Sequence, residues 1–167
     1  MLQSQPQVLY TPEQRAKRDA TRWTLVQGVL APVQFLVFLV SLYLVLTSLK
    51  TGEDTDWALA SVVIKTLVLY AIMITGCIWE KVVFDKYLFA PAFFWEDVVS
   101  MLVMALHTAY LWVWWQGSWS TSEQLWLALA AYVTYGINAA QYIRKLRMAR
   151  LQRPHDHFVD STTQVSA

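Results

Sequence analysis

The sequence predicts an all-α integral membrane protein, a four-helix bundle with both termini in the cytoplasm. Of the 167 residues, 56% are hydrophobic and only 15% are charged. The apolar residues form four blocks, and each is long enough to supply the ~20 residues that a helix needs to cross a bilayer. Lys and Arg gather in the leading segment, the middle connector and the tail. Cytoplasmic segments of membrane proteins carry such an excess of basic residues.

We expect four membrane-spanning helices, which follow the apolar blocks in order: residues 23–49, 57–79, 93–116 and 123–146. The first connector is marked by Gly52 and its acidic neighbours, and the third covers residues 117–122. The second connector holds charged residues and a proline, namely Lys81, Asp85, Lys86 and Pro91. Together the spans form one transmembrane domain, residues 23–147.

The segments outside this domain are polar. Residues 1–22 form a basic cytoplasmic segment, in which Thr11, Pro12 and Glu13 predict the start of a short helix. Residues 148–167 form a cytoplasmic tail that we expect to be disordered. Its basic residues are typical of topology determinants that contact lipid headgroups, so nucleic acid is not an expected partner.

Two adjacent carboxyl groups, those of Glu96 and Asp97, stand at the start of the third span. Ionisable residues in such positions are costly and mark candidate sites. One interpretation is that they complement the helix dipole, which favours acidic residues in a first turn. The other is a functional acid or base pair, because a carboxylic acid kept neutral in a dry pocket can donate a proton.

His107 and Lys65 lie deep in the third and second spans. With a rise of about 1.5 Å per residue, their side chains sit at similar heights in a core of about 30 Å, so we expect them to share a polar pocket. Lys65 is either an ion-pair partner of an acidic group or a substrate contact. His107 is either bonded between helices or a ligand or catalytic group, and it shares a helix face with Glu96 that forms a candidate cleft wall.

A second set of polar side chains is expected near the cytoplasmic surface. Glu80 and Lys81 have the pattern of a solvated turn, in which Glu80 is the member expected to point inward. Asn138 and Gln141 are three positions apart and share a helix face. We interpret them either as interhelical contacts or as ligand contacts. Cys77 is the only cysteine, so no disulfide within one chain is expected.

Several stretches of the sequence carry long and unusual motifs. They are WTLVQGVLAPVQFLVF at 23–38, IWEK at 78–81, LFAPAFFWED at 88–97, ALHTAYL at 105–111, and NAAQ at 138–141 with KLR at 145–147. These motifs closely resemble those of the 2-vinyl bacteriochlorophyllide hydratases of anoxygenic phototrophs. The resemblance covers nearly the whole chain, from about residue 9 to residue 150.

The resemblance implies a hydro-lyase that adds water across the 3-vinyl group of a magnesium chlorin or bacteriochlorin. The product carries a 3-(1-hydroxyethyl) group on the way to bacteriochlorophyll a. No cofactor is implied, and no metal ion held by the protein itself. The implied partners are the magnesium tetrapyrrole substrate, membrane lipid and other enzymes of the pathway. The implied location is the bacterial inner, photosynthetic membrane.

The resemblance brings no assigned catalytic set, so the roles of individual residues are inferred from their chemistry. Glu96 or Asp97 is the expected proton donor to the vinyl group, and His107 or Glu80 is expected to orient water. His107 has an alternative role as axial ligand to the substrate's magnesium.

The flat, apolar macrocycle calls for aromatic stacking and a few polar contacts. The candidate stacking residues are Phe93, Phe94, Trp95, Trp79 and Tyr135. The candidate polar contacts are Asn138, Gln141 and Lys65, and the candidates for meeting the propionate are Lys81 and Arg144.

Two other classes of function fit parts of the pattern. A non-catalytic pigment-binding or assembly protein would hold a magnesium chlorin through His107 without changing it. A small transporter would use Lys65 and the acidic cluster as an ion path, but the sequence lacks visible inverted repeats or paired broken helices. The family resemblance makes the hydratase the favoured prediction.

Overall fold

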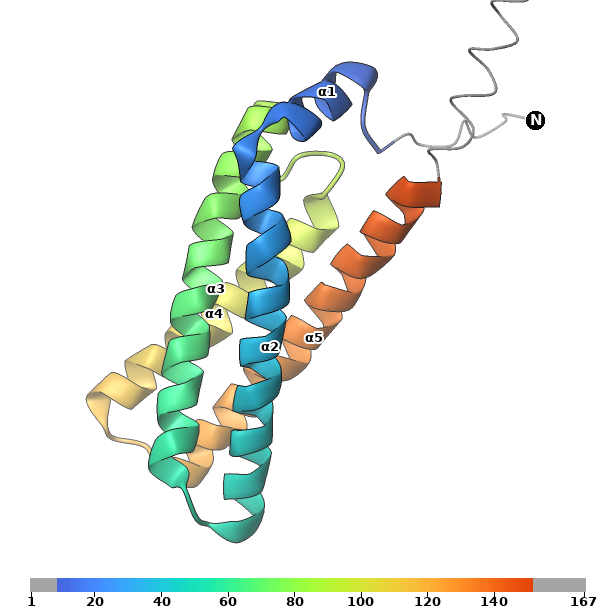
Figure 1. Cartoon of the computed structure of the whole chain (residues 1–167). Coiled ribbons are helices and arrows are strands. Elements are labelled where there is room, and N and C mark those ends of the chain that lie inside the picture. The colour runs from blue at the N-terminus through green and yellow to red at the C-terminus, as the bar shows by residue number, and fades with distance from the viewer. Residues whose placement is uncertain (1–8, 152–167) are drawn as a thin grey trace, which may run out of the picture.

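The computed structural model describes residues 9–151, and these residues form five α-helices joined by short connectors (Figure 1). The helices are α1 (Pro12–Ala20), α2 (Arg22–Thr51), α3 (Thr55–Phe84), α4 (Phe94–Gln116) and α5 (Thr121–Leu151). Within this range there is no β-strand. The all-α class is therefore confirmed.

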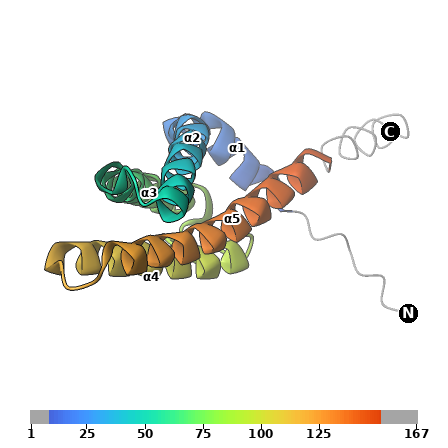
Figure 2. The same cartoon turned by 90° about the horizontal axis from the view of Figure 1, so that it is seen from below.

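The four long helices form two hairpins. Helix α2 packs along α3, and α4 packs along α5. The hairpins meet through contacts of α2 and α3 with α5, and of α3 with α4. Figure 2 shows the α4–α5 pair as a layer of its own, inclined to the α2–α3 pair. The interior between the layers is where the buried polar residues of the sequence come together.

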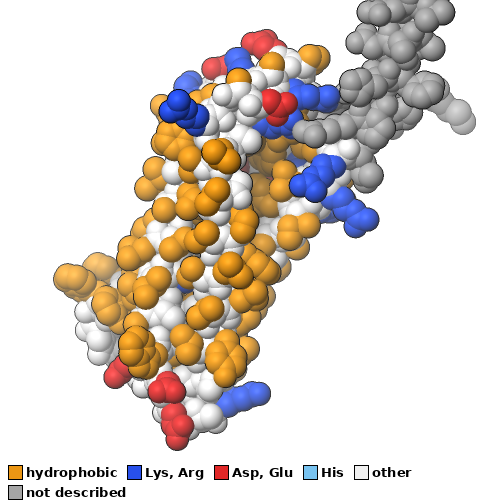
Figure 3. Space-filling view, in the orientation of Figure 1, with side chains coloured by type: hydrophobic (Ala, Val, Ile, Leu, Met, Phe, Trp, Pro, Cys, Tyr) orange, Lys and Arg blue, Asp and Glu red, His pale blue; other side chains and the backbone are white. Residues whose placement is uncertain are grey.

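Three of the described helices, α2, α3 and α4, are long and apolar enough to cross a bilayer, which indicates a membrane protein. Helix α5 has 31 residues and is more polar, so its crossing stays a prediction. In Figure 3, hydrophobic side chains cover the middle of the visible face, and charged side chains gather at its two ends. This distribution fits a molecule whose middle lies in lipid.

The helices match the predicted spans with one correction. Helix α3 continues beyond Trp79 to Phe84, so Lys81 is helical and the prediction that it lies in the connector is wrong. No helix breaker occurs between Trp79 and Phe84, and the helix ends only where Asp85 takes a left-handed φ of 61°. At the other end of the chain, α5 reaches Leu151. The remainder of the predicted tail, with His155 and His157, lies outside the described residues.

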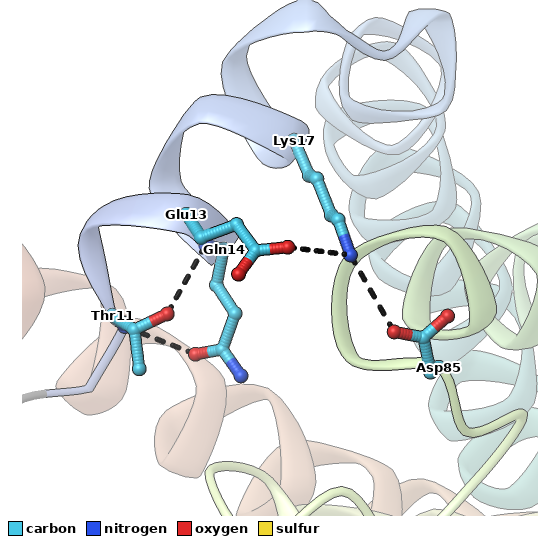
Figure 4. A network of polar contacts seen from close by, with 5 residues as sticks. All are labelled: Thr11, Glu13, Gln14, Lys17 and Asp85. Carbon is cyan, nitrogen blue, oxygen red and sulfur yellow. Dashed lines mark hydrogen bonds and ion pairs between the residues drawn. The ribbon is translucent and has the colours of Figure 1, made fainter.

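The short helix α1 begins where the sequence predicts it. Thr11 is its N-cap, and the Thr11 hydroxyl and the Gln14 side chain each accept a hydrogen bond from the other's backbone N–H (Figure 4). Lys17 Nζ lies 3.3 Å from Glu13 Oε1 and 3.5 Å from Asp85 Oδ2. Its hydrogen bond to Glu13 raises the pKa of Lys17, as does the charge of Asp85. These contacts hold α1 against the end of α3.

Small side chains allow the long helices to approach one another. Ala58 on α3 and Ala128 on α5 are fully buried in one apolar cluster that also contains Val62, Leu125 and Tyr132. Close helix packing in membranes commonly uses residues of this size. The cluster lies towards the end of the molecule that holds the α2–α3 connector, so the opposite end is left for the polar residues.

We expect Ala128→Leu to lower stability by about 1–3 kcal/mol, because a larger side chain in a filled site forces its neighbours apart. Ala130→Leu is the matched control, since Ala130 is on the same helix and exposed. Thermal unfolding of both variants in detergent, followed by circular dichroism, checks the expectation. Equal midpoints for the two variants would contradict the packing described.

Candidate functional site

A cleft of about 520 Å³ opens at the end of the molecule where α1 meets the end of α5. Clefts of this size are typical of small-molecule sites. Its lining comes from the leading segment, α1, the end of α3, the α3–α4 connector, the start of α4 and the end of α5: Leu9, Gln14, Phe84, Pro91, Ala92, Trp95, Glu96, Gln141, Arg144, Lys145 and Met148. Of the predicted site residues, it brings together Trp95, Glu96, Gln141 and Arg144.

Glu96 is the carboxyl group in this lining. It lies in the first turn of α4, is 7% exposed, and its Oε2 accepts a hydrogen bond from Lys145 Nζ at 3.1 Å. Lys145 comes from the last turns of α5, so the pair joins the two helices across the cleft. Sequence reasoning missed Lys145 as a partner of Glu96.

Further polar contacts continue this pairing along α4 and α5. The Tyr142 hydroxyl donates to Asp97 Oδ1 at 3.4 Å, and Asn138 Nδ2 donates to Ser100 Oγ at 2.8 Å. Tyr142 was also missed by sequence reasoning. The available signal was spacing, because positions 138, 141, 142 and 145 follow the i, i+3, i+4, i+7 pattern of one helix face.

Glu80 and Asp97, here called the carboxyl pair, face each other below the α3–α4 connector. Both are buried, and the charge of Asp97 acts on the Glu80 carboxyl. Asp97 Oδ2 accepts a hydrogen bond from the Phe89 N–H at 2.8 Å, which holds Phe89 at a left-handed φ of 59°. No N–H or O–H group of residues 9–151 donates to Glu80 Oε2. Glu80 thus points inward, as predicted.

Lys65 and His107, here called the mid-bundle pair, are both fully buried. Lys65 Nζ lies 2.7 Å from His107 Nε2, and His107 Nδ1 donates to the Val103 carbonyl at 2.8 Å. The predicted shared pocket is therefore confirmed. Lys65 Nζ also lies 4.0 Å from the centre of the Tyr135 ring, a cation–π contact. Among the described residues Lys65 has no acidic partner, so the ion-pair interpretation is wrong.

The mid-bundle pair is remote from the cleft. His107 lies 11 residues after Glu96 on α4, which is about 16 Å along the helix axis. His107 is absent from the lining, so the prediction that Glu96 and His107 form one cleft wall is wrong. Both ring nitrogens of His107 are engaged by protein groups, which leaves neither free for a magnesium ion in this arrangement.

The predicted stacking residues divide between cleft and core. Trp95 is 68% exposed and lines the cleft, and Phe94 packs edge-on against Trp95 outside the lining. Phe93 and Trp79 instead pack against each other in an internal aromatic cluster. Tyr135 is buried beside Phe38, away from the cleft.

Lys81 also lies outside the cleft lining, and its Nζ donates to the Asp85 carbonyl at 3.0 Å. Gln14, which sequence reasoning missed, reaches the cleft because α1 folds back over the connector. Across residues 9–151, no group of three or more His, Cys, Asp or Glu side chains converges to hold a metal ion.

Comparison with known proteins supplies the family. Residues 10–148 match the family model described as 2-vinyl bacteriochlorophyllide hydratase (BCHF). The 2-vinyl bacteriochlorophyllide hydratase of Cereibacter sphaeroides is 67% identical over 143 residues, which are 86% of this chain and 89% of that protein. The protein of the same name from Rhodobacter capsulatus is 64% identical over 144 residues, 86% of this chain and 84% of that protein. No solved structure matches at a significant level.

The mid-bundle pair generates a stability prediction. We expect His107→Leu to destabilise the protein by about 1–3 kcal/mol, because it leaves the buried Lys65 amine without its hydrogen-bond acceptor. The double variant Lys65→Met/His107→Leu should recover most of that loss, since two apolar side chains of similar size replace the pair. Unfolding midpoints of the single and double variants test this coupling. Additive losses would show that the two side chains do not depend on each other.

Proposed function

The chain belongs to the 2-vinyl bacteriochlorophyllide hydratase family, and we propose that it binds its substrate in the cleft beside Glu96. Its function is the addition of water to a vinyl bacteriochlorophyllide in bacteriochlorophyll biosynthesis. The observation that carries the proposed location is a buried carboxyl group in the wall of a ligand-sized cleft, at the end of apolar helices.

The chemistry requires one proton donor and one water molecule. Protonation of the terminal vinyl carbon leaves a positive charge on the adjacent carbon, which the conjugated macrocycle delocalises. Water then forms the new C–O bond and loses a proton to a neighbouring base. The overall reaction adds one water molecule to the substrate without oxidation or reduction. We therefore propose that no cofactor takes part.

Glu96 is the proposed proton donor. Its carboxyl lines the cleft, and its Oε2 shares a hydrogen bond with the Lys145 ammonium. The proton that Glu96 gives to the vinyl carbon is carried on Oε1, since Oε2 accepts from Lys145, and the Lys145 ammonium stabilises the carboxylate that remains. A flat substrate over the cleft would exclude water and strengthen these interactions.

Glu80 is the proposed acceptor of the proton that water loses. It lies one helical turn before Phe84, which lines the cleft, and its Oε2 lacks a donor among the described residues. Asp97 is the less exposed partner, and its two oxygens accept hydrogen bonds from Phe89 and Tyr142. We assign Asp97 to holding Glu80 and the connector in place, rather than to proton donation.

Trp95 and Arg144 are the proposed substrate contacts at the mouth of the cleft. The Trp95 indole can stack on the macrocycle, and the Arg144 guanidinium can pair with the propionate carboxylate. The mid-bundle pair and Tyr135 have no step in this mechanism.

The cleft end is proposed to face the cytoplasm, in the inner photosynthetic membrane. Basic residues of α1 and the end of α5 lie at this end. At the other end, in and beside the α2–α3 connector, Glu53, Asp54 and Asp56 are accompanied by a single basic residue, Lys50. This asymmetry supports a cytoplasmic location for the basic end. An amphipathic tetrapyrrole could then enter from the membrane surface.

We expect Glu96→Gln to lower the rate of hydration at least 100-fold with the fold intact, because general acid catalysis contributes about 10²–10⁴ in rate. Glu53→Gln, at the opposite end of the molecule, is the control. The rate is read from the shift of the substrate's red absorption band to shorter wavelength as the vinyl conjugation is lost. Undiminished hydration by Glu96→Gln would refute the assignment, and a wild-type chain that leaves the extracted pigment unchanged would point to a pigment-binding protein.

Arg144→Gln should raise KM for the free-acid substrate by about tenfold and leave KM for the propionate methyl ester unchanged, because only the acid offers a carboxylate. Arg147→Gln is the control, since Arg147 lies on the same helix outside the cleft lining. Steady-state kinetics with both substrates measure the difference. An equal increase in KM for the acid and the ester would mean that Arg144 does not bind the propionate carboxylate.

A further inference from the structure

Two amide oxygens of α5 are buried beside Glu96 without hydrogen-bond donors. They are Asn138 Oδ1 and Gln141 Oε1, and no described residue donates to either atom. Asn138 is only 8% exposed. Buried acceptors in native proteins usually accept a hydrogen bond from the protein or from bound water. Because no described residue donates to these two atoms, we expect a bound molecule to supply the donor.

The orientation of the Asn138 amide follows from its neighbours. The Ser100 hydroxyl donates its hydrogen to the Glu96 carbonyl at 2.8 Å, so its oxygen can only accept from Asn138. The Asn138 Nδ2 group must therefore face Ser100. Its Oδ1 then points away from Ser100 as an acceptor, and a rotation of the amide by 180° would break an existing hydrogen bond.

Gln141 places the second acceptor on the same side of α5. Three residues separate Asn138 and Gln141, a spacing that puts their side chains next to each other on the helix. Gln141 lines the cleft together with Glu96 and Lys145. Along α5 it lies between Asn138, which contacts Ser100, and Lys145, which contacts Glu96. Gln141 therefore borders the part of the cleft next to the proposed proton donor, and Asn138 lies about one turn of α5 before it, outside the lining.

We propose that Asn138 Oδ1 and Gln141 Oε1 bind the water molecule that adds to the vinyl group. The inference rests on the proposed function of the cleft. Water donates one hydrogen to each amide oxygen, which leaves a lone pair on its oxygen to form the C–O bond with the cation. One hydrogen of the oxonium that results then leaves its amide oxygen and passes as a proton to a carboxylate, for which Glu80 is proposed. Asn138 and Gln141 are positioning residues, since neither gains nor loses a proton.

This arrangement predicts a specific defect when an acceptor is removed. Without a positioned water, the cation can return its methyl proton and become the vinyl substrate again. In D₂O each such reversal can leave deuterium on the terminal vinyl carbon of recovered substrate. A water-positioning variant therefore loses hydration and keeps isotope exchange, whereas loss of the proton donor abolishes both.

The test uses Gln141→Met and Asn138→Leu in the full chain, assayed in D₂O with vinyl chlorophyllide. Each side chain keeps its approximate size and loses its amide oxygen. Gln124→Met is the matched control, because Gln124 also has a buried Oε1 without a described donor but lies at the opposite end of α5. Gln141→Glu retains an acceptor oxygen and should rescue part of the activity. Mass spectrometry reports deuterium in the recovered substrate, and absorbance reports product.

We expect Gln141→Met to lower kcat about tenfold, the effect of losing one hydrogen bond of ordinary strength. KM should stay within twofold, and deuterium in recovered substrate should increase relative to product. Asn138→Leu should show the same changes in kcat, KM and deuterium content. If Asn138→Leu does not fold, the result for Gln141→Met alone tests the water site. Unchanged kcat in Gln141→Met, or a parallel loss of hydration and exchange, would overturn the water site.

The Glu96→Gln variant separates this inference from the proposed function. If Glu96→Gln retains both hydration and exchange, the proton donor has been misassigned, whatever Gln141→Met does. If Glu96→Gln loses both while Gln141→Met hydrates normally, the donor assignment stands and the water site is wrong.

Discussion

The candidate site depends on the register between α4 and α5. Three polar contacts at successive levels set that register: Glu96 with Lys145, Asp97 with Tyr142, and Ser100 with Asn138. In an apolar environment each of these groups is costly without a partner, so a shift of one helix along the other would leave several of them unsatisfied. The same contacts that fix the helices therefore bring the Glu96 carboxyl and the Lys145 ammonium to one cleft, beside the Gln141 amide.

The protein contains two kinds of buried polar site. They differ in whether their hydrogen-bonding atoms already have protein partners. In the mid-bundle pair, the amine of Lys65 and both ring nitrogens of His107 are committed to protein partners and an aromatic ring. Around the cleft, acceptor atoms of Glu80, Asn138 and Gln141 lack donors among residues 9–151. Hydration needs groups that can bind water and exchange protons, which favours the cleft over the middle of the bundle as the place of reaction.

The sequence predicted the long helices well, because apolar length alone marks helices able to span lipid. It also predicted that Lys65 and His107 meet, since helix rise sets their depth. It could not show that Lys145 and Tyr142 face the acidic residues, because spacing defines a helix face but not the neighbouring helix. Aromatic residues were equally ambiguous, and Phe93 proved to fill the core rather than line the cleft.

The most direct test of the cleft as the substrate site is protection from chemical labelling. Met148→Cys and Met101→Cys, each in a Cys77→Ser background, place a thiol on the cleft lining and on an exposed face of α4. The two native side chains are similarly exposed, at 49% and 42%. Bound vinyl chlorophyllide should slow maleimide labelling at position 148 and leave position 101 unchanged. Equal labelling rates at position 148 with and without saturating substrate would contradict the location of the site.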